Sequence, residues 1–222
     1  LAMPEQWFLL QSGPGRAAHN MALDEALLEA ASRLGRPVLR FYGWTEPAAS
    51  FGYFQDYAAV ERICSLRPLI RRPTGGGLVE HEGDWTYSLV FPASHSWHGL
   101  KAQDSYRRAH QWMQRALARL GVATELARRP QPGAPGQCFA GAVPLDVLWA
   151  GRKIAGAAQR RTRHGLLIQG SVQPPPLNLR RDDWQAAVCA VAQAQWGVEW
   201  VPLAPDAALS ERADELARAK YA

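Results

Sequence analysis

The run of residues best suited to binding an anion is Arg71-Arg72-Pro73-Thr74-Gly75-Gly76-Gly77-Leu78-Val79-Glu80-His81. Glycine lacks a Cβ and adopts positive φ, so successive N–H groups of such a run can converge on an anion. Guanidinium groups pair well with phosphate or carboxylate. A triple glycine is also a common loop, and His81 fits either a catalytic role or a structural one bonded to that loop. The candidate ligand-binding residues are Arg71, Arg72, Thr74, Gly75, Gly76, Gly77 and His81.

A second run whose residues could take part in catalysis or binding is Gly151-Arg152-Lys153-Ile154-Ala155-Gly156-Ala157-Ala158-Gln159-Arg160-Arg161. Only three of the 25 basic residues in the chain are lysines, which favours a specific use of the amine for any one of them, Lys153 included. The small residues Gly156, Ala157 and Ala158 leave space beside this lysine for another strand or a ligand chain. The alternative is a basic turn followed by a solvated strand.

Composition limits the class of protein. The 222 residues are 47% hydrophobic, enough for one domain over residues 1–222. We expect no membrane span, because no window is apolar for long enough, and no secretory signal. The three cysteines show no metal-binding spacing, which predicts a cytoplasmic protein without a metal site. The net charge of +5 fits a solvated basic surface or an acidic protein partner, and no motif indicates nucleic acid binding.

Hydrophobic periodicity predicts the elements that position these runs. Asn20 is the expected N-cap of the first helix, and Asp104 or Ser105 of the second. We expect helices at 20–34, 105–120, 182–195 and over the last fifteen residues, and strands at 38–42, 84–91, 144–150, 153–155 and 166–171. Residues 128–136 are rich in proline and glycine and predict a loop. Helices and strands alternate without a regular βαβ repeat, so the predicted fold is α+β, with a mixed or antiparallel central sheet flanked by helices.

Taken together, the motifs resemble the lipoate–protein ligase A and octanoyltransferase family, which has a biotin/lipoate ligase-type catalytic domain. The segments that carry the resemblance are Asn20–Glu25, Leu39–Trp44, Gly52–Gln55, Arg71–His81, Tyr87–Leu89 and Gly151–Arg161, with a weaker match at Gly165–Ser171. The resemblance implies an acyl chain held in a tunnel, with the glycine run against the acyl group or its adenylate. It also implies that Lys153 hydrogen-bonds the acyl carbonyl or phosphate, where a cationic donor stabilises a developing oxyanion.

Cys138 lies fifteen residues before Lys153 and resembles the nucleophile of cysteine-dependent octanoyltransferases. Such a cysteine accepts the acyl group as a thioester and divides one transfer into two steps. A nearby cation would lower its pKa. The alternative is a cysteine that only packs as a small hydrophobic residue, which is our expectation for Cys64 and Cys189.

The leading functional hypothesis is therefore transfer of an octanoyl or lipoyl group to a lysine of a lipoyl-domain or glycine-cleavage H-type protein. Acyl carrier protein would be the donor, and no cofactor would be required. The first alternative is the catalytic domain of an ATP-dependent lipoate–protein ligase, which would use ATP and Mg. The expected absence of a C-terminal accessory domain favours the transferase.

The sequence departs from the family's pattern in the strand after the lysine run. Family members usually carry a histidine where this chain has Leu167-Ile168-Gln169-Gly170-Ser171, and Ile168 cannot donate a hydrogen bond. His164 is close in sequence but need not point the same way. This departure motivates a further alternative, a member of the fold that binds an acyl ligand without catalysis. Asp146 fits the aspartate that often precedes the lysine run, in a structural or hydrogen-bonding role.

Overall fold

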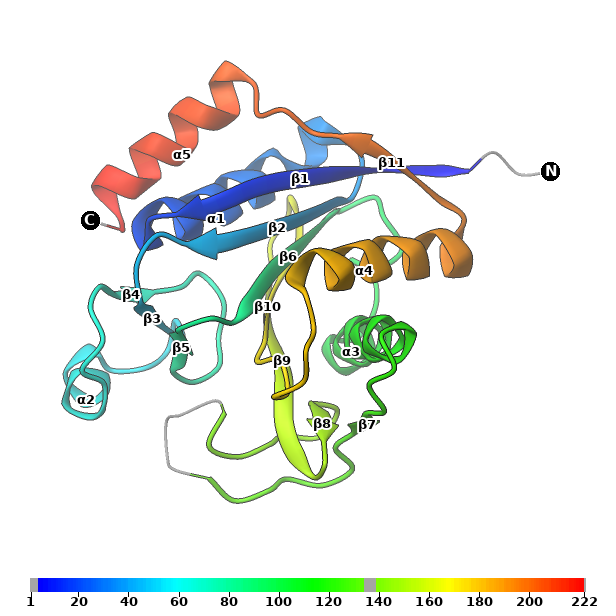
Figure 1. Cartoon of the computed structure of the whole chain (residues 1–222). Coiled ribbons are helices and arrows are strands. Elements are labelled where there is room, and N and C mark those ends of the chain that lie inside the picture. Colours follow the sequence, from blue (N-terminus) through cyan, green and yellow to red (C-terminus); the bar gives the residue numbers. More distant parts are fainter. Residues whose placement is uncertain (1–3, 134–138, 222) are drawn as a thin grey trace.

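An eight-stranded mixed sheet forms the centre of the molecule (Figure 1). The computed structural model describes residues 4–133 and 139–221. Strands β11, β1 and β2 pair in parallel, and all later pairs along the sheet are antiparallel. The strands in spatial order are β11 (Val198–Pro202), β1 (Glu5–Gly15), β2 (Val38–Trp44), β6 (Trp85–Pro92), β10 (Gly165–Val172), β9 (Arg152–Arg161), β8 (Val147–Trp149) and β7 (Glu125–Leu126). The predicted α+β class with a mixed sheet is confirmed.

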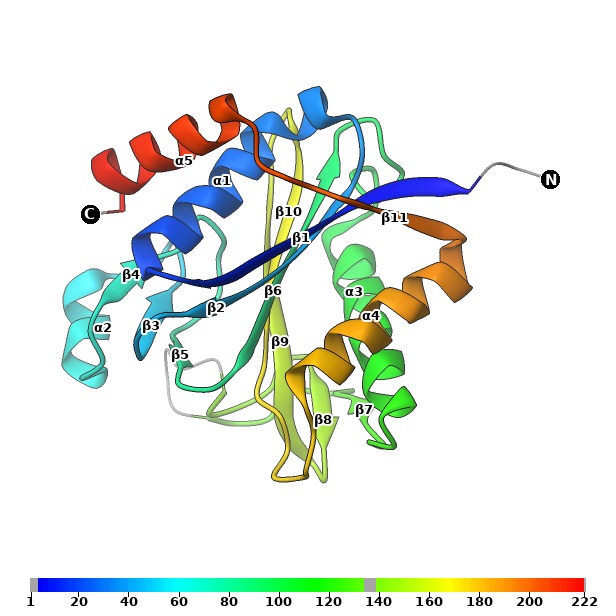
Figure 2. The same ribbon diagram turned by 45° about the horizontal axis from the view of Figure 1, so that its top comes forward.

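Helices cover both faces of this sheet (Figure 2). Helix α1 (Ala17–Leu34) lies against one face, with α5 (Ala207–Ala219) packed on its outer side. Helices α3 (Ala102–Arg119) and α4 (Arg181–Trp196) cover the other face. Successive strand residues point to opposite faces. On β10, Leu167 therefore joins the core under α1, while Leu166 and Ile168 join the core under α3 and α4.

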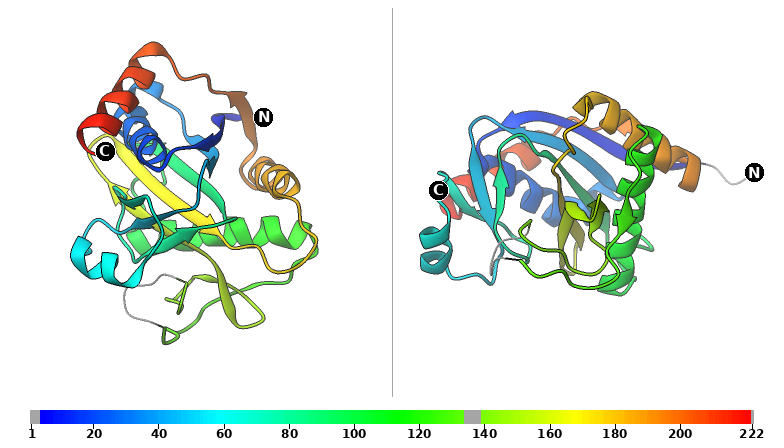
Figure 3. Two further views of the ribbon diagram at one scale, coloured as in Figure 1. Left: turned by 60° about the vertical axis from the view of Figure 1, so that its left-hand side comes forward. Right: turned by 60° about the horizontal axis from the view of Figure 1, so that its bottom comes forward.

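A smaller sheet carries the glycine run. It has the order β4 (Leu69–Arg71), β3 (Ala48–Phe51) and β5 (Val79–His81), with β3 and β4 parallel and β3 and β5 antiparallel. Helix α2 (Tyr57–Ile63) packs beside it, at the end of the molecule away from α3 and α4 (Figure 3). Because the glycine run joins β4 to β5, this small sheet fixes both ends of the run.

The expected elements are present, but the caps differ. Helix α1 begins at Ala17, so Asn20 lies within the helix instead of capping it. Its buried amide donates to the carbonyls of Gly15 and Gly43. Helix α3 begins at Ala102, so Asp104 and Ser105 also lie inside their helix. The predictions of these N-caps were wrong, because buried and helix-internal polar side chains found partners other than the first free N–H groups.

Two of the three cysteines, Cys64 and Cys189, lie in the part of the chain that the structure describes. Cys64 is 3% exposed and packs in the small core beside α2, as expected. Cys189 packs against the core from α4, and burial raises the pKa of its thiol to about 12. Cys138 lies outside the described residues.

No helix within the described ranges is both long and apolar enough to cross a membrane.

Candidate active site

A pocket opens where the glycine run faces the large sheet. Its walls come from α1, β2, the small sheet, β6, β9 and β10, so distant segments of the chain converge there. The lining residues are Met21, Tyr42, Trp44, Ser50, Arg72, Gly76, Val79, His81, Thr86, Phe139, Lys153, Gly156, Ala157, Ala158, Gln169, Gly170 and Ser171. The two runs identified from sequence therefore line one and the same pocket.

Lys153 brings a buried cation to this pocket. Its Nζ lies 2.8 Å from Asp146 Oδ2, and the two side chains are 7% and 0% exposed. Asp146 also accepts hydrogen bonds from the Tyr106 hydroxyl at 2.6 Å and from the Val143 amide at 2.8 Å. The ring of Phe139 lies 5.0 Å from Nζ. A buried cation paired on one side and open to the pocket on the other can stabilise negative charge on a bound carbonyl.

The small residues of β9 provide the space for this lysine. A Cβ added to Gly156 would lie 2.7 Å from Lys153 Cε and 2.9 Å from Nζ. Ala158 and Gly156 pair with Gln169 and Ser171 of β10, so these four residues share one face of the sheet. The expected role of Gly156 beside the lysine agrees with this contact.

The two arginines of the glycine run hold the chain's own backbone. Arg72 is buried and donates to the carbonyls of Gly75 and Gly77 and to that of Ser50. Arg71 donates to the carbonyls of Tyr53 and Gln55 and does not line the pocket. The sequence led us to expect guanidinium groups directed at an anion. In the structure their hydrogen bonds brace the loop.

Close backbone approach explains one glycine outside the run. A Cβ on Gly52 would lie 1.9 Å from the carbonyl oxygen of Gly76, so this position admits no side chain while the loop keeps its place. Gly76 itself has a φ of 89°, in the left-handed region that favours glycine. Gly52 and Gly76 thus fix how deeply the glycine run reaches toward the sheet.

Strand β10 presents Gln169, not Ile168, to the pocket. Ile168 is fully buried in the core under α3 and α4. Gln169 accepts a 2.7 Å hydrogen bond from the Thr74 hydroxyl and donates to Asp24 Oδ2 at 2.7 Å. The apolar residue at 168 therefore removes no polar group from the pocket, and Thr74 acts by tying the glycine run to the sheet.

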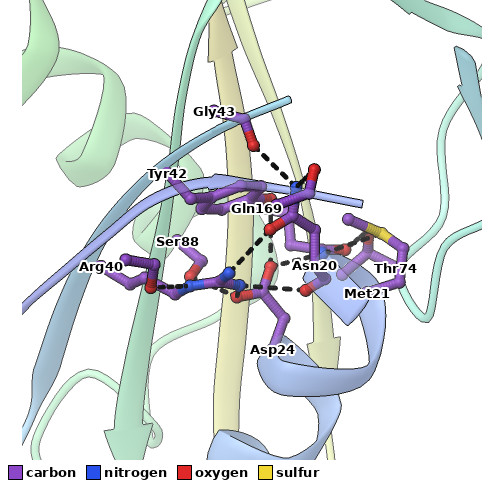
Figure 4. A network of polar contacts seen from close by, with 11 residues as sticks. Asn20, Met21, Asp24, Arg40, Tyr42, Gly43, Thr74, Ser88 and Gln169 are labelled. Atoms are coloured by element: carbon purple, nitrogen blue, oxygen red, sulfur yellow. Dashed lines mark hydrogen bonds and ion pairs between the residues drawn. The ribbon is translucent and has the colours of Figure 1, made fainter. Parts of the chain in front are cut away.

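A buried polar network lies beneath this contact (Figure 4). Asp24 forms an ion pair with Arg40 at 2.7 Å, with both side chains 1% exposed or less. It also accepts from Ser88 and from the hydroxyl of Tyr42. Burial and the nearby Asp24 charge raise the pKa of Tyr42 well above its usual range. Arg40, Ser88, Tyr42 and Gln169 all donate to the Asp24 carboxylate, so the network gives the pocket a rigid, hydrogen-bonded floor.

His81 has partners on both ring nitrogens. Nε2 lies 2.8 Å from Ser50 Oγ, and Nδ1 lies 2.8 Å from Asp84 Oδ2. The indole of Trp44 stacks on the imidazole at a centroid distance of 3.9 Å. The structure thus places His81 in the pocket wall and bonds it to side chains, whereas the structural alternative expected bonds to the loop backbone.

An open groove adjoins the pocket and shares two of its residues. Phe139 and Lys153 line both spaces. The other residues of the groove are Leu78, Glu80, Glu82, Ala140, Arg152 and Gln173. The arrangement suits a ligand with one end buried in the pocket and a bulkier remainder in the groove.

Sequence reasoning named several residues that lie at this pocket. Lys153, Gly156, Ala157, Ala158, Gly76, Arg72 and His81 line it, whereas Arg71, Thr74, Gly75 and Gly77 do not. It missed Ser50, Gln169 and Ser171. The period-two alternation of β10 was the available signal for two of these, because it places Gln169 and Ser171 on one face. Within the described ranges, no group of three or more His, Cys, Asp or Glu side chains is arranged to hold a metal ion.

Comparison with known proteins gives consistent results. Residues 16–174 match the family model described as the lipoyl protein ligase A/B catalytic domain. Octanoyltransferase LipM of Kyrpidia tusciae is 38% identical over 185 residues, covering 76% of this chain and 66% of that protein. LipM of Oceanobacillus iheyensis is 36% identical over 177 residues, covering 77% and 64%. The chain thus spans slightly less than two thirds of the length of these relatives.

Solved structures share the fold. Lipoate–protein ligase A bound with ATP superposes with a TM-score of 0.75 at 20% identity, covering 98% of this chain and 96% of that chain. The bi-partite lipoate protein ligase of Thermoplasma acidophilum superposes with a TM-score of 0.70 at 20% identity, covering 98% and 94%. At this level of identity the likeness concerns the fold alone.

Proposed function

The chain belongs to the lipoyl protein ligase A/B catalytic-domain family, and from this we propose that it is an acyltransferase of protein lipoylation. It would move an octanoyl group from acyl carrier protein to a lysine of a lipoyl-domain or glycine-cleavage H-type protein. The LipM octanoyltransferases, at 33–38% identity, support this reaction over ATP-dependent ligation. The ligase structures resemble the chain at only 20% identity.

The observation that carries the proposal is the buried Lys153 cation facing a pocket of small and apolar residues. Met21, Val79, Ala157 and Phe139 offer apolar surface to an alkyl chain. Lys153 lies at the junction of this pocket with the open groove. An acyl chain in the pocket would bring its carbonyl carbon to the junction, where the ammonium stabilises the oxyanion of the tetrahedral intermediate.

We propose Cys138 as the residue that carries the acyl group between donor and acceptor. Its chain neighbour Phe139 lines the pocket and lies 5.0 Å from Lys153 Nζ. A Cys138 thiolate would attack the octanoyl thioester and release the donor thiol. The amine of the acceptor lysine would then attack the enzyme thioester, forming an amide and releasing the cysteine.

This route needs no nucleotide, because the thioester arrives activated. The ligase alternative requires ATP and Mg, and the likeness to the ATP-bound ligase fold keeps it as an outcome to test. The non-catalytic alternative depended on Ile168. That side chain lies in the core and does not reach the pocket.

One experiment separates these functions. The protein is incubated with octanoyl acyl carrier protein, or with lipoate and ATP, and intact mass is measured before and after addition of a lipoyl-domain acceptor. We expect an octanoyl adduct on the enzyme that is absent from Cys138→Ser and that passes to the acceptor. Acceptor modification only with lipoate and ATP would establish the ligase instead. Ligand binding without acceptor modification under either condition would indicate a binding protein.

A further inference from the structure

Ser50, His81 and Asp84 form a continuous hydrogen-bonded chain in the pocket wall. Ser50 Oγ lies 2.8 Å from His81 Nε2, and His81 Nδ1 lies 2.8 Å from Asp84 Oδ2. Ser50 comes from β3, His81 from β5, and Asp84 directly precedes β6. They are 2%, 5% and 4% exposed, so protein surrounds the chain of bonds on all sides except the pocket.

The partners of Asp84 determine the direction of these hydrogen bonds. Asp84 Oδ2 also accepts from Ser171 Oγ at 2.6 Å and from Thr86 Oγ1 at 3.2 Å. Since an ionised carboxylate only accepts, His81 Nδ1 must carry a proton. Nε2 of a neutral His81 is then an acceptor for the Ser50 hydroxyl. These are the relations that allow a serine, a histidine and an aspartate to move a proton.

The arrangement is held in place from both ends. Arg72 donates to Ser50 Oγ at 3.2 Å, which leaves the hydroxyl proton of Ser50 directed at His81. Trp44 stacks on the imidazole and donates from Nε1 to Thr86 at 2.9 Å, so it fixes the ring plane. A histidine with a purely structural role would not require hydrogen-bond partners on both ring nitrogens and a position in the pocket wall as well.

Acyl transfer to an amine requires an acceptor for a proton. The attacking amine must lose one proton to become an amide nitrogen, and the departing thiolate must gain one. Lys153 cannot accept it, because its ammonium is ion-paired with Asp146 and has no lone pair. Ser50 and His81 line the same pocket and supply a neutral acceptor.

We propose that Ser50, His81 and Asp84 are a proton relay for the transfer step, an assignment that rests on the proposed acyltransferase function. As the amine nitrogen bonds to the thioester carbonyl carbon, its proton passes to Ser50 Oγ and the serine proton passes to His81 Nε2. Asp84 stabilises the resulting imidazolium. When the carbon–sulfur bond breaks, the proton returns along the same path to the leaving thiolate. Thioester and amine thus become amide and thiol with no external acid or base.

The test isolates the transfer step. Wild-type protein, Ser50→Ala, His81→Asn and Asp84→Asn are loaded with octanoyl from octanoyl acyl carrier protein, and loss of the adduct is followed by intact mass. One sample receives a lipoyl-domain acceptor and another receives hydroxylamine, a much weaker base than a lysine amine, whose adduct can lose its proton to water without a general base. We expect transfer to the acceptor lysine to fall by about 10²–10⁴-fold in His81→Asn, the usual range for a lost general base, and hydroxylamine to restore most of the rate.

Controls separate this outcome from loss of structure. His19→Asn removes an exposed histidine that faces Asp214 of α5 at 3.8 Å and does not line the pocket, and should transfer like wild type. Thermal melting identifies any variant that does not fold. Asp84→Asn keeps the shape of the relay and should slow lysine transfer on its own, by up to about 10⁴-fold if it imposes the wrong tautomer.

Three results would overturn the relay. The first is transfer to lysine at the wild-type rate by His81→Asn. The second is an equal loss with lysine and with hydroxylamine, which indicates a positioning role. The third is an octanoyl ester located on Ser50, which indicates a nucleophile. If the wild-type protein modifies no acceptor, both the proposed function and the relay are contradicted. If the wild type and the relay variants all modify the acceptor at the same rate, only the relay is contradicted.

Discussion

Lys153 Nζ and Asp146 Oδ2 lie 2.8 Å apart in a pair of side chains that are both buried. Two further donors, Tyr106 and Val143, satisfy the same carboxylate. The lysine has only this ion partner and the Phe139 ring among the described residues. Asp146 therefore fixes the position of the Lys153 ammonium. If the lysine is replaced, the carboxylate keeps other hydrogen-bond donors. If the aspartate is replaced, the ammonium loses its counter-charge.

Replacing Asp146 by Asn should destabilise the protein more than replacing Lys153 by Met. Asp146→Asn leaves a buried ammonium without a counter-charge, a situation that costs about 3–5 kcal/mol. After Lys153→Met the carboxylate keeps two hydrogen-bond donors, so the loss in unfolding free energy should be smaller. Urea denaturation of both variants checks this order. Equal losses would show that the lysine finds other partners.

Lys153→Met should nevertheless abolish most acyl transfer. Removing one donor that stabilises an oxyanion typically lowers turnover by about 10²–10³-fold. Steady-state rates with octanoyl acyl carrier protein measure the effect, and Lys101→Met provides a control at an exposed lysine just before α3. Comparable turnover in Lys153→Met and Lys101→Met would contradict the role given to Lys153.

Gly156→Ala should act through the lysine. The new Cβ would lie 2.7 Å from Lys153 Cε, so the flexible stem must move aside and carry the ammonium away from Asp146. Since the far end of a side chain can yield, we expect little loss of stability but about a tenfold or greater loss in turnover. Gly99→Ala, whose Cβ would meet its nearest atom at 3.7 Å, is the matched control. If Gly156→Ala turns over at the wild-type rate, the exact position of the Lys153 ammonium is not critical for acyl transfer.

The sequence predicted the elements with a clear local pattern and missed those without one. The helices now seen as α1, α3, α4 and α5 were expected because their apolar residues recur at helical spacing. The central strands β2, β6 and β10 were expected because their segments are rich in apolar, aromatic and β-branched residues. Strands β1 and β11 were not predicted. They pair with partners distant in the sequence, and their local residues carry no clear alternation.

The candidate site shows the same limit at the level of single residues. Glycine runs and a rare lysine are visible in a sequence. Ser50 lies in a short apolar strand, and its bond to His81 arises only when β3 and β5 pair. The sequence also could not show that Arg72 would bind its own loop carbonyls. A guanidinium suits backbone oxygens as well as phosphate, and only tertiary structure decides between them.

Gly52→Ala should displace the glycine run. The added Cβ would lie 1.9 Å from the Gly76 carbonyl oxygen, and this neighbour is backbone, which cannot rotate away. We expect a stability loss of about 1–3 kcal/mol, typical of overpacking, together with loss of acyl transfer. Thermal unfolding and transfer assays at a temperature where the variant is folded separate the two effects. Retained transfer would mean that the depth of the loop is not required.

Asp24→Ala should cost about 3–5 kcal/mol of unfolding free energy, because it leaves the buried Arg40 charge without its counter-ion. Gln169 would also lose an acceptor, which weakens its link to Thr74. Glu61→Ala, which breaks an ion pair with Arg67 between side chains 46% and 47% exposed, should cost less than about 1 kcal/mol. Similar shifts in the urea midpoint for both variants would contradict a special role for the Asp24 network.

His110 should make the protein less stable in mild acid. Burial lowers the pKa of this histidine to about 4, while its ordinary value is 6.5. Its Nδ1–H donates to the Leu145 carbonyl at 2.6 Å, and Nε2 finds no partner among the described residues. The folded state therefore holds the neutral ring. Its contribution to stability is full above pH 6.5 and is lost as pH falls toward 4.

The expected size follows from the shift in pKa between unfolded and folded protein. At 1.36 kcal/mol per unit, the loss amounts to about 3 kcal/mol between pH 7 and pH 4. His110→Asn retains a donor for Leu145 but does not titrate. Between pH 7 and pH 4, the unfolding free energy of this variant should therefore fall by about 3 kcal/mol less than that of wild type. Carboxylates titrate in both proteins and cancel in the difference. Parallel stability curves for wild type and His110→Asn would show that His110 accepts a proton in the folded protein at little cost.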